Sequence, residues 1–201
     1  GNTWSCETVD NYLETGRYSS LALDPLSGQP HISYFQTSYG LLRYARRVGS
    51  SGNCGTGNTW RCETVFDIGS IGGYTSLVVD GNGLPHISYY FGPTRDLQYA
   101  YLDGGSWYTE TVDSSGDVGL YTSLALDAQY RVHVSYYYQT GLDLKYARGC
   151  QAVREVAISG PALLQVGETG AYTASLRPLA ATRPVTLTWD SGTIGPTTTY
   201  S

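Results

Sequence analysis

The sequence predicts an all-β fold built from a repeated four-stranded unit, and two observations carry this prediction. First, 19 tyrosines and 25 glycines among 201 residues, with only 14% charged residues, favour short strands joined by tight turns over helices. Second, four short blocks of sequence occur three times in the same order. Each block alternates between two faces, as a strand does, so one repeat accounts for one four-stranded sheet.

The first block of each repeat has aliphatic residues on one face and small residues on the other. In Tyr18–Asp24, Leu21 and Leu23 alternate with Ser20 and Ala22. Each copy ends in an aspartate that we expect to bond its own backbone within a turn. The other two copies are Tyr74–Asp80 and Tyr121–Asp127.

The second block places a histidine and a serine on one face and two larger side chains on the other. In its first copy, His31 and Ser33 alternate with Ile32 and Tyr34. The third block is short and has the form Leu-x-Tyr-Ala. The copies of these two blocks are Pro30–Tyr34, Pro85–Tyr89 and Val132–Tyr136, and Leu42–Ala45, Leu97–Ala100 and Leu144–Ala147.

The fourth block contains a tryptophan followed by the string Glu-Thr-Val, and the repeat length fixes the architecture. The second block recurs after 55 residues, from His31 to His86, and after 47 residues, from His86 to His133. Four strands in a repeat of this length are typical of β-propeller blades. The sequence therefore predicts three four-stranded, propeller-type blades. The copies of the fourth block are Trp4–Val9, Trp60–Val65 and Trp107–Val112.

These strings resemble the repeats of bacterial extracellular β-propeller proteins, of the form W-x-x-E-T-V-D, Y-T-S-L-A-L-D-x-x-G-x-P-H-I-S-Y-Y and L-x-Y-A. The resemblance covers residues 1–150 and implies that the first block is the innermost strand and the tryptophan block the outer strand. Trp4–Val9 is then an outer strand without inner strands before it, and the third blade has no outer strand of its own. We expect this assembly strand, marked by Trp4, Cys6, Glu7 and Val9, to complete the third blade of the same chain or of a second copy.

Residues 151–201 differ in composition from the repeats. Three strand-like segments, at residues 153–161, 166–176 and 184–190, resemble the first half of a bacterial Ig-like or PKD-like sandwich, with Trp189 on the third strand. Complete sandwiches of this type have about seven strands in about 100 residues. We therefore expect a second, partial Ig-like domain.

The four cysteines are expected to form disulfides. They lack the C-x-x-C spacing of zinc sites, and disulfides indicate an oxidising, extracellular compartment. Cys54 and Cys62 flank the start of an outer strand and are expected to pair. By equivalence in the repeat, Cys6 corresponds to Cys62 and Cys150 to Cys54, so a second bridge should join Cys6 to Cys150.

The Cys6–Cys150 bridge is more compatible with two chains than with one. Within one chain it would close a ring of three blades, whereas propellers have about four to eight. Two chains would make a six-bladed ring, and a rotation that does not close would make a filament. The alternative is that the sequence is an excerpt of a longer protein that supplies further blades.

Catalytic chemistry is not expected. His31, His86 and His133 recur once per repeat, which favours a structural role over a metal site. Glycosidases need two carboxyls about 5–10 Å apart, and an evenly repeated glutamate offers no such pair. The sequence contains no nucleophile elbow, P-loop or dinucleotide fingerprint, and we expect no cofactor. A sialidase-like glycoside hydrolase is a distant alternative, because the turn at Asp24 and Gly28 shares only these two residues with the sialidase motif.

Carbohydrate binding is the main alternative function. Aromatic residues follow the second block of every repeat, and Phe35, Tyr90 and Tyr137 are the candidates for stacking on sugars. Repeated sites of this kind would act multivalently. This hypothesis describes a propeller lectin or adhesin.

Charge and hydropathy exclude two further classes of partner. The net charge is −5 and there is no run of Lys or Arg, which argues against nucleic acid. No apolar stretch is long enough to span a membrane as a helix. We therefore expect a secreted, non-enzymatic structural or cell-surface protein whose partner is a second copy of itself, with glycans as the alternative partner.

Overall fold

The fold is all-β. The computed structural model describes residues 1, 3–69, 72–149, 155–159 and 173–177, and the chain divides into two compact units, Gly1–Cys150 and Gln151–Ser201. The described residues form strands and one short 3-10 turn at Thr56–Asn58, and they contain no α-helix.

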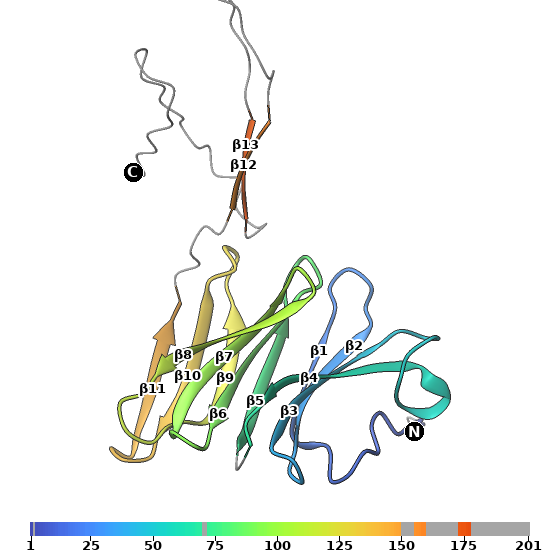
Figure 1. Ribbon diagram of the computed structural model, residues 1–201, viewed down its shortest axis with the longest axis horizontal. Coiled ribbons are helices and arrows are strands. Elements are labelled where there is room, and N and C mark those ends of the chain that lie inside the picture. Colours follow the sequence, from blue (N-terminus) through green and yellow to red (C-terminus); the bar gives the residue numbers. More distant parts are fainter. Residues whose placement is uncertain (2, 70–71, 150–154, 160–172, 178–201) are drawn as a thin grey trace, which may run out of the picture. The chain divides into compact units, whose positions relative to one another are not determined.

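Three antiparallel sheets make up the first unit, and within each sheet the strands lie in sequence order (Figure 1). The first sheet contains β1 (Arg17–Leu23), β2 (Pro30–Gln36), β3 (Leu41–Arg47) and β4 (Trp60–Asp67). The second contains β5 (Gly72–Val79), β6 (Pro85–Phe91), β7 (Asp96–Asp103) and β8 (Ser106–Asp113). The third contains β9 (Val118–Leu126), β10 (Val132–Tyr138) and β11 (Asp143–Arg148). The predicted strand blocks from residue 18 to residue 147 are confirmed, and the third sheet has three strands among the described residues.

The first strand of each sheet is irregular at the same repeat position. The pairing of β1 with β2 shifts register between Arg17 and Ser20, and the equivalent strands of the other two sheets shift in the same region. Tyr18, Tyr74 and Tyr121 lie inside these irregularities with φ angles of 53°, 51° and 52°. A left-handed backbone is unusual for tyrosine, so its occurrence three times identifies a built-in feature of the repeat.

The aspartates that end the first strands form the expected turns. Asp24 accepts a hydrogen bond from the backbone N–H of Leu26 at 2.9 Å, and Asp127 accepts one from that of Gln129 at 2.9 Å. The equivalent pair in the second sheet, Asp80 and Asn82, has the same bond. The predicted role of these aspartates is therefore confirmed.

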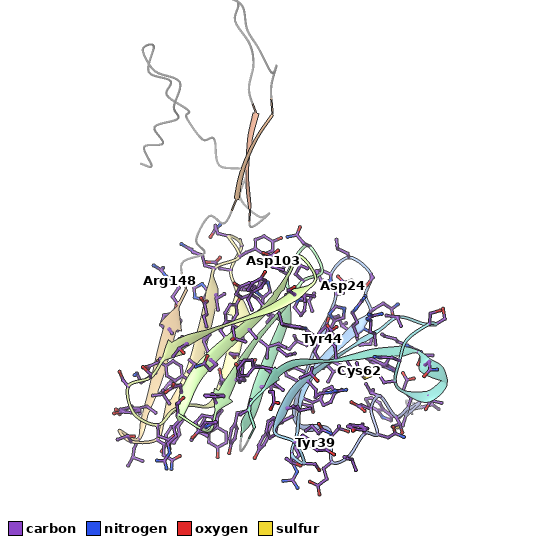
Figure 2. All side chains as sticks on the ribbon, in the orientation of Figure 1. Asp24, Tyr39, Tyr44, Cys62, Asp103 and Arg148 are labelled. Carbon is purple, nitrogen blue, oxygen red and sulfur yellow. A yellow bond between two sulfur atoms is a disulfide. The ribbon has the colours of Figure 1, made fainter. Side chains whose placement is uncertain are left out.

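The sheets pack face to face, with the first strand of each sheet beside the first strand of the next. One apolar core lies between the first and second sheets and contains Tyr44 (Figure 2), and a second core lies between the second and third sheets. Contacts between sheets decrease from the inner strands to the outer strands, so the sheets fan apart toward β4 and β8. The described strands do not close into a ring.

Trp4–Val9 does not form a strand in the single chain. Its last residues lie against the first sheet, where the carbonyl of Thr8 accepts a hydrogen bond from the N–H of Thr56 at 3.2 Å. The segment therefore does not complete the third sheet of its own chain. Its pairing with the third sheet of a second copy stays a prediction.

The second unit contains one described hairpin. β12 (Glu155–Ser159) pairs antiparallel with β13 (Thr173–Arg177). These strands fall within or overlap the first two strand-like segments that the sequence predicts, while the third segment, at residues 184–190, lies outside the described residues.

Candidate assembly interface

The contact between successive sheets occurs twice in the same form, and we call it the joint. We call the face of a sheet that points toward the next sheet along the chain its trailing face, and the opposite face its leading face. In each joint the trailing face of one sheet meets the leading face of the next. The first joint brings Leu42 and Tyr44, on the trailing face of the first sheet, together with Leu77, Ile87 and Tyr89, on the leading face of the second. The equivalent positions form the second joint.

Serine side chains fasten each joint to the backbone of the next sheet. The Oγ atom of Ser20 accepts a hydrogen bond from the N–H of Leu77 at 3.0 Å, and the Oγ of Ser76 accepts one from the N–H of Leu124 at 2.9 Å. A second pair of hydroxyls also repeats, with 2.8 Å between the side-chain oxygens in each case. These pairs are Ser33 with Thr75, and Ser88 with Thr122.

A column of tyrosines crosses both joints. The ring centroids of Tyr18 and Tyr74 are 4.6 Å apart, and those of Tyr74 and Tyr121 are 4.7 Å apart. Burial, together with the neighbouring hydroxyls, raises the pKa of Tyr74 to about 12. The three residues of this column are the same three that have a left-handed backbone, so the unusual backbone conformation coincides with the joint.

The outer strands contribute two polar contacts. Across the first joint, the Nε1–H of Trp107 donates to Glu63 Oε1 at 3.2 Å. Across the second, Asp113 accepts hydrogen bonds from Tyr136 Oη, at 2.6 Å, and from Lys145. Burial opposes ionisation of Asp113, but these two donors outweigh it and lower its pKa to about 2.

The end of the N-terminal segment contacts the first sheet in the way that the outer strands β4 and β8 contact the sheets that follow them. Val9 packs in a cluster with Tyr34 and Ala45, as the equivalent Val65 packs near Tyr89 and Ala100. Its neighbour Asp10 accepts a hydrogen bond from Tyr34 Oη at 2.6 Å and pairs with Arg43 at 3.2 Å, which repeats the arrangement of Asp113.

Two buried donors on the first sheet lack an acceptor among the described residues, Nε1 of Trp60 and Nε of Arg43. Among the described residues, none accepts a hydrogen bond from the buried Nε1 of Trp60, whereas the equivalent Trp107 bonds Glu63. The equivalent of Glu63 is Glu7, which instead lies 3.8 Å from Arg47 and is partly exposed. A buried unpaired donor costs about 1–3 kcal/mol, so the leading end of the unit is incomplete at this atom.

The two outermost faces expose residues that the joints bury elsewhere. Leu21 is 63% exposed on the leading face of the first sheet, whereas its equivalent Leu77 is 4% exposed. Leu144 is 83% exposed on the trailing face of the third sheet, whereas its equivalent Leu97 is 0% exposed. Leu23 and Tyr146 are exposed in the same way.

A shallow hollow lies between the N-terminal segment and the leading face of the first sheet. Its volume is about 310 Å³, and its wall includes Val9, Asp10, Ser19, Ile32 and Tyr34. This hollow adjoins Thr8 and Val9 at the end of the assembly strand.

The cysteines are in part as predicted. Cys54 and Cys62 form a disulfide with a Cα–Cα distance of 5.9 Å, which confirms that pairing. Cys6 is an exposed free thiol in the single chain, and Cys150 lies outside the described residues. The Cys6–Cys150 bridge stays a prediction.

The structure buries two of the three candidate sugar-stacking residues. Phe35 is 2% exposed in the core of the first joint. Tyr90 is buried as well, and its hydroxyl donates to Asp117 at 3.0 Å. Neither ring has a face that a sugar could cover, and Tyr137 is half-buried beside Tyr121. Carbohydrate stacking is therefore the weaker candidate function.

The three histidines occupy one repeated structural position. Each Nδ1 lies within hydrogen-bonding distance of a tyrosine hydroxyl on the next strand, at 2.7 Å for His31 with Tyr44 and 2.6 Å for His133 with Tyr146. His86 contacts Tyr99 in the same way. The histidines are therefore one per sheet and do not converge, and no cluster of three metal-ligating side chains occurs in the described part of the chain.

Comparison with known proteins gives no relative on which to base a function. No family model matches the chain, and no curated protein matches it. None of the described helices is long and apolar enough to cross a membrane. The joint and the two open faces are therefore the features of the molecule that bear on its function.

Proposed function

We propose that the protein is a non-enzymatic, extracellular structural protein that assembles with copies of itself by β-strand complementation. The observation that carries this proposal is the position of Val9 and Asp10, which lie on the first sheet as an outer strand lies on the following sheet. The sequence prediction that Trp4–Val9 is the outer strand of a propeller-type blade accounts for these positions of Val9 and Asp10.

The acceptor for the donated strand is the free edge of the third sheet. β11 pairs with β10 on one side, and no described strand pairs with its other side. In the first two sheets the equivalent edge is covered by β4 and β8. An added strand would satisfy the open backbone groups of β11 and remove an edge that otherwise invites aggregation.

A disulfide locks the donated strand in place. In the first sheet, Cys54 and Cys62 staple the outer strand β4 to the segment before it. Cys6 of a donor would meet Cys150 of an acceptor in the equivalent arrangement, and the exposed thiol of Cys6 is available for this reaction. Such bridges form in oxidising compartments, which supports an extracellular location.

A non-reducing denaturing gel tests the proposal. The oxidised protein should run as a covalent dimer or larger species, and reductant should convert it to monomer. The variant Cys6→Ser should run as monomer without reductant. The matched control is the double variant Cys54→Ser with Cys62→Ser, which removes the confirmed bridge and should remain covalently assembled.

Peptide mapping identifies the cross-link. The expected product is a peptide pair that contains Cys6 and Cys150 from different chains, which mixing isotopically labelled and unlabelled protein distinguishes. A fully oxidised protein that stays monomeric would show that strand donation locked by this bridge is wrong.

A further inference from the structure

We infer that the partner is a second copy docked face to face, with the trailing face of its third sheet on the leading face of the first sheet, in a closed dimer of six sheets. This inference rests on the proposed function and goes beyond it. Strand donation concerns the edge of β11, whereas face docking concerns the broad sheet surfaces. The two can fail separately.

The two open faces are the complementary halves of a joint that the chain already makes twice. The leading face of the first sheet exposes Leu21 and Leu23. The equivalents of Leu21, Leu77 and Leu124, are buried in the joints, and Leu126, an equivalent of Leu23, packs against the second core. The trailing face of the third sheet exposes Leu144 and Tyr146, whose equivalents Leu42 and Tyr44 are fully buried. Exposed apolar patches of this kind mark interaction surfaces, and the two internal joints show which surface fits which.

The polar contacts of the joint are also available at the open faces. Ser123 is exposed and corresponds to Ser20 and Ser76, so its Oγ would accept the N–H of Leu21 in the partner. Tyr121 is exposed at one end of the tyrosine column and Tyr18 at the other. Docking would place Tyr121 of one copy beside Tyr18 of the other, so that the tyrosine columns of the two copies continue at the spacing found within each chain.

The hollow on the first sheet lies where a joint would place a side chain of the preceding sheet. In the first joint, Leu42 shares a core with Ile87, Tyr89 and Val65. The equivalents of these three residues are Ile32, Tyr34 and Val9, and all three line the hollow. The side chain that belongs there by equivalence is that of Leu144 from the partner.

The assembly strand completes the two tryptophan contacts. In the internal joint, Trp107 donates to Glu63. At the new joint, Trp60 would donate to Glu7 of its own chain, which supplies the acceptor that its buried Nε1 lacks. Trp4 is 89% exposed in the single chain, and by the same equivalence it would donate to the exposed Glu110 of the partner.

The number of sheets in each chain limits the size that a closed assembly can have. If the new joint repeats the internal one, every sheet turns by the same step, and a ring contains a multiple of three sheets. Propellers have about four to eight blades, and six is the one multiple of three in that range. Two copies related by a twofold axis then make two identical joints.

A mixing experiment under reducing conditions tests the docking. Leu21→Lys blocks the leading face and Leu144→Lys blocks the trailing face, because each places a charge inside the joint. The unmodified 201-residue chain should have the mass of a dimer by light scattering. Each variant alone should be monomeric, with a Kd raised at least about 100-fold. A dimer of one variant with the other has both lysines in one joint and none in the other. An equimolar mixture should therefore recover dimer.

The chain offers a matched control for each variant. Leu26 and Leu142 are exposed leucines whose equivalents, Asn82 and the Arg95 side chain, stay exposed although the second sheet is covered on both faces. Leu26→Lys and Leu142→Lys should therefore remain dimeric. Far-ultraviolet circular dichroism of all four variants checks that the sheets are intact.

The outcomes separate docking from strand donation. Complementation in the mixture supports docking, whether or not the Cys6 cross-link forms. A Cys6-dependent covalent dimer without complementation would retain strand donation and overturn docking. A monomeric unmodified chain would overturn docking and leave the faces to further blades of a longer polypeptide, and an open-ended polymer would overturn closure at six sheets.

Discussion

The second sheet and its two neighbours are built from the same repeat, but they differ in how many of their faces are covered. The second sheet packs against a sheet on both sides, and its Leu77 and Leu97 are buried. The first and third sheets are covered on one side by a neighbouring sheet, and at the same repeat positions their outer faces expose Leu21 and Leu144. The residue type is identical in each comparison, so the presence of a neighbouring sheet determines whether these leucines are buried.

The exposed faces therefore carry side chains suited to burial. A sheet that faces water normally alternates apolar and polar residues, whereas a sheet covered on both faces is apolar on both. At Leu21, Leu23, Leu144 and Tyr146, the outer faces of the first and third sheets follow the second pattern. They resemble the inner sheets of a larger assembly more than its ends.

The largest expected effect compares a covered leucine with its open equivalent. In the Leu21→Lys background, which keeps the protein monomeric on our proposal, Leu97→Ala should lower the free energy of unfolding by about 2–5 kcal/mol, because it leaves a cavity. Leu144→Ala in the same background should change it by less than about 0.5 kcal/mol. Urea unfolding measures both values. Equal losses would show that the trailing face of the third sheet is already covered within one chain.

A smaller effect is expected from the disulfide, which the first sheet has and the fully covered second sheet lacks, with Thr109 in place of Cys62. Replacing Cys54 and Cys62 together by serine should lower the free energy of unfolding by about 2 kcal/mol, because the bridge restricts the unfolded chain across a short loop. Cys6→Ser is the control and should leave the monomer unchanged. Thermal unfolding of the reduced and oxidised Cys6→Ser variant, which cannot form the Cys6–Cys150 bridge, provides an independent measurement, and no difference between them would contradict the prediction.

The smallest expected effect concerns the charge pair across the second joint. The pKa of Asp113 is about 2 in the folded protein, below its ordinary value of 3.8, so its contribution is complete well above pH 3.8 and is lost as the pH falls toward 2. Asp113→Asn should lower the free energy of unfolding by about 1 kcal/mol at pH 7. The difference between the two proteins should shrink as the pH is lowered from 5 to 2. A constant difference would show that Asp113 acts without its charge.

Features that depend on neighbouring residues in the sequence were predictable. The alternation in Leu97–Ala100 and its equivalents fixed the strands, the aspartates fixed the turns, and the short spacing of Cys54 and Cys62 fixed their disulfide. Strand order followed from the repeat. These features need no information about how one sheet meets another.

Features that depend on the contact between sheets were missed or misplaced. Phe35 and Tyr90 follow a strand and look accessible in the sequence, but the adjacent sheet buries them. A signal for the joint was nevertheless present. The residue after the Glu-Thr-Val string varies together with the second residue of the next Leu-x-Tyr-Ala block along the chain. An aspartate at the first position occurs with a basic residue at the second, as in Asp10 with Arg43 and Asp113 with Lys145. Where the first position is Phe66, the second is the uncharged Gln98.

The attachment of Asp10 to its own first sheet has a consequence for the speed of assembly. In most strand exchanges a segment must first detach from its own fold, and this unfolding step limits the rate. Here Asp10 and Val9 can keep their contacts, and only residues 4–8 must extend toward the partner. We therefore expect association at the rate of ordinary protein docking, about 10⁵–10⁷ M⁻¹ s⁻¹, without the long lag of a segment that must first unfold.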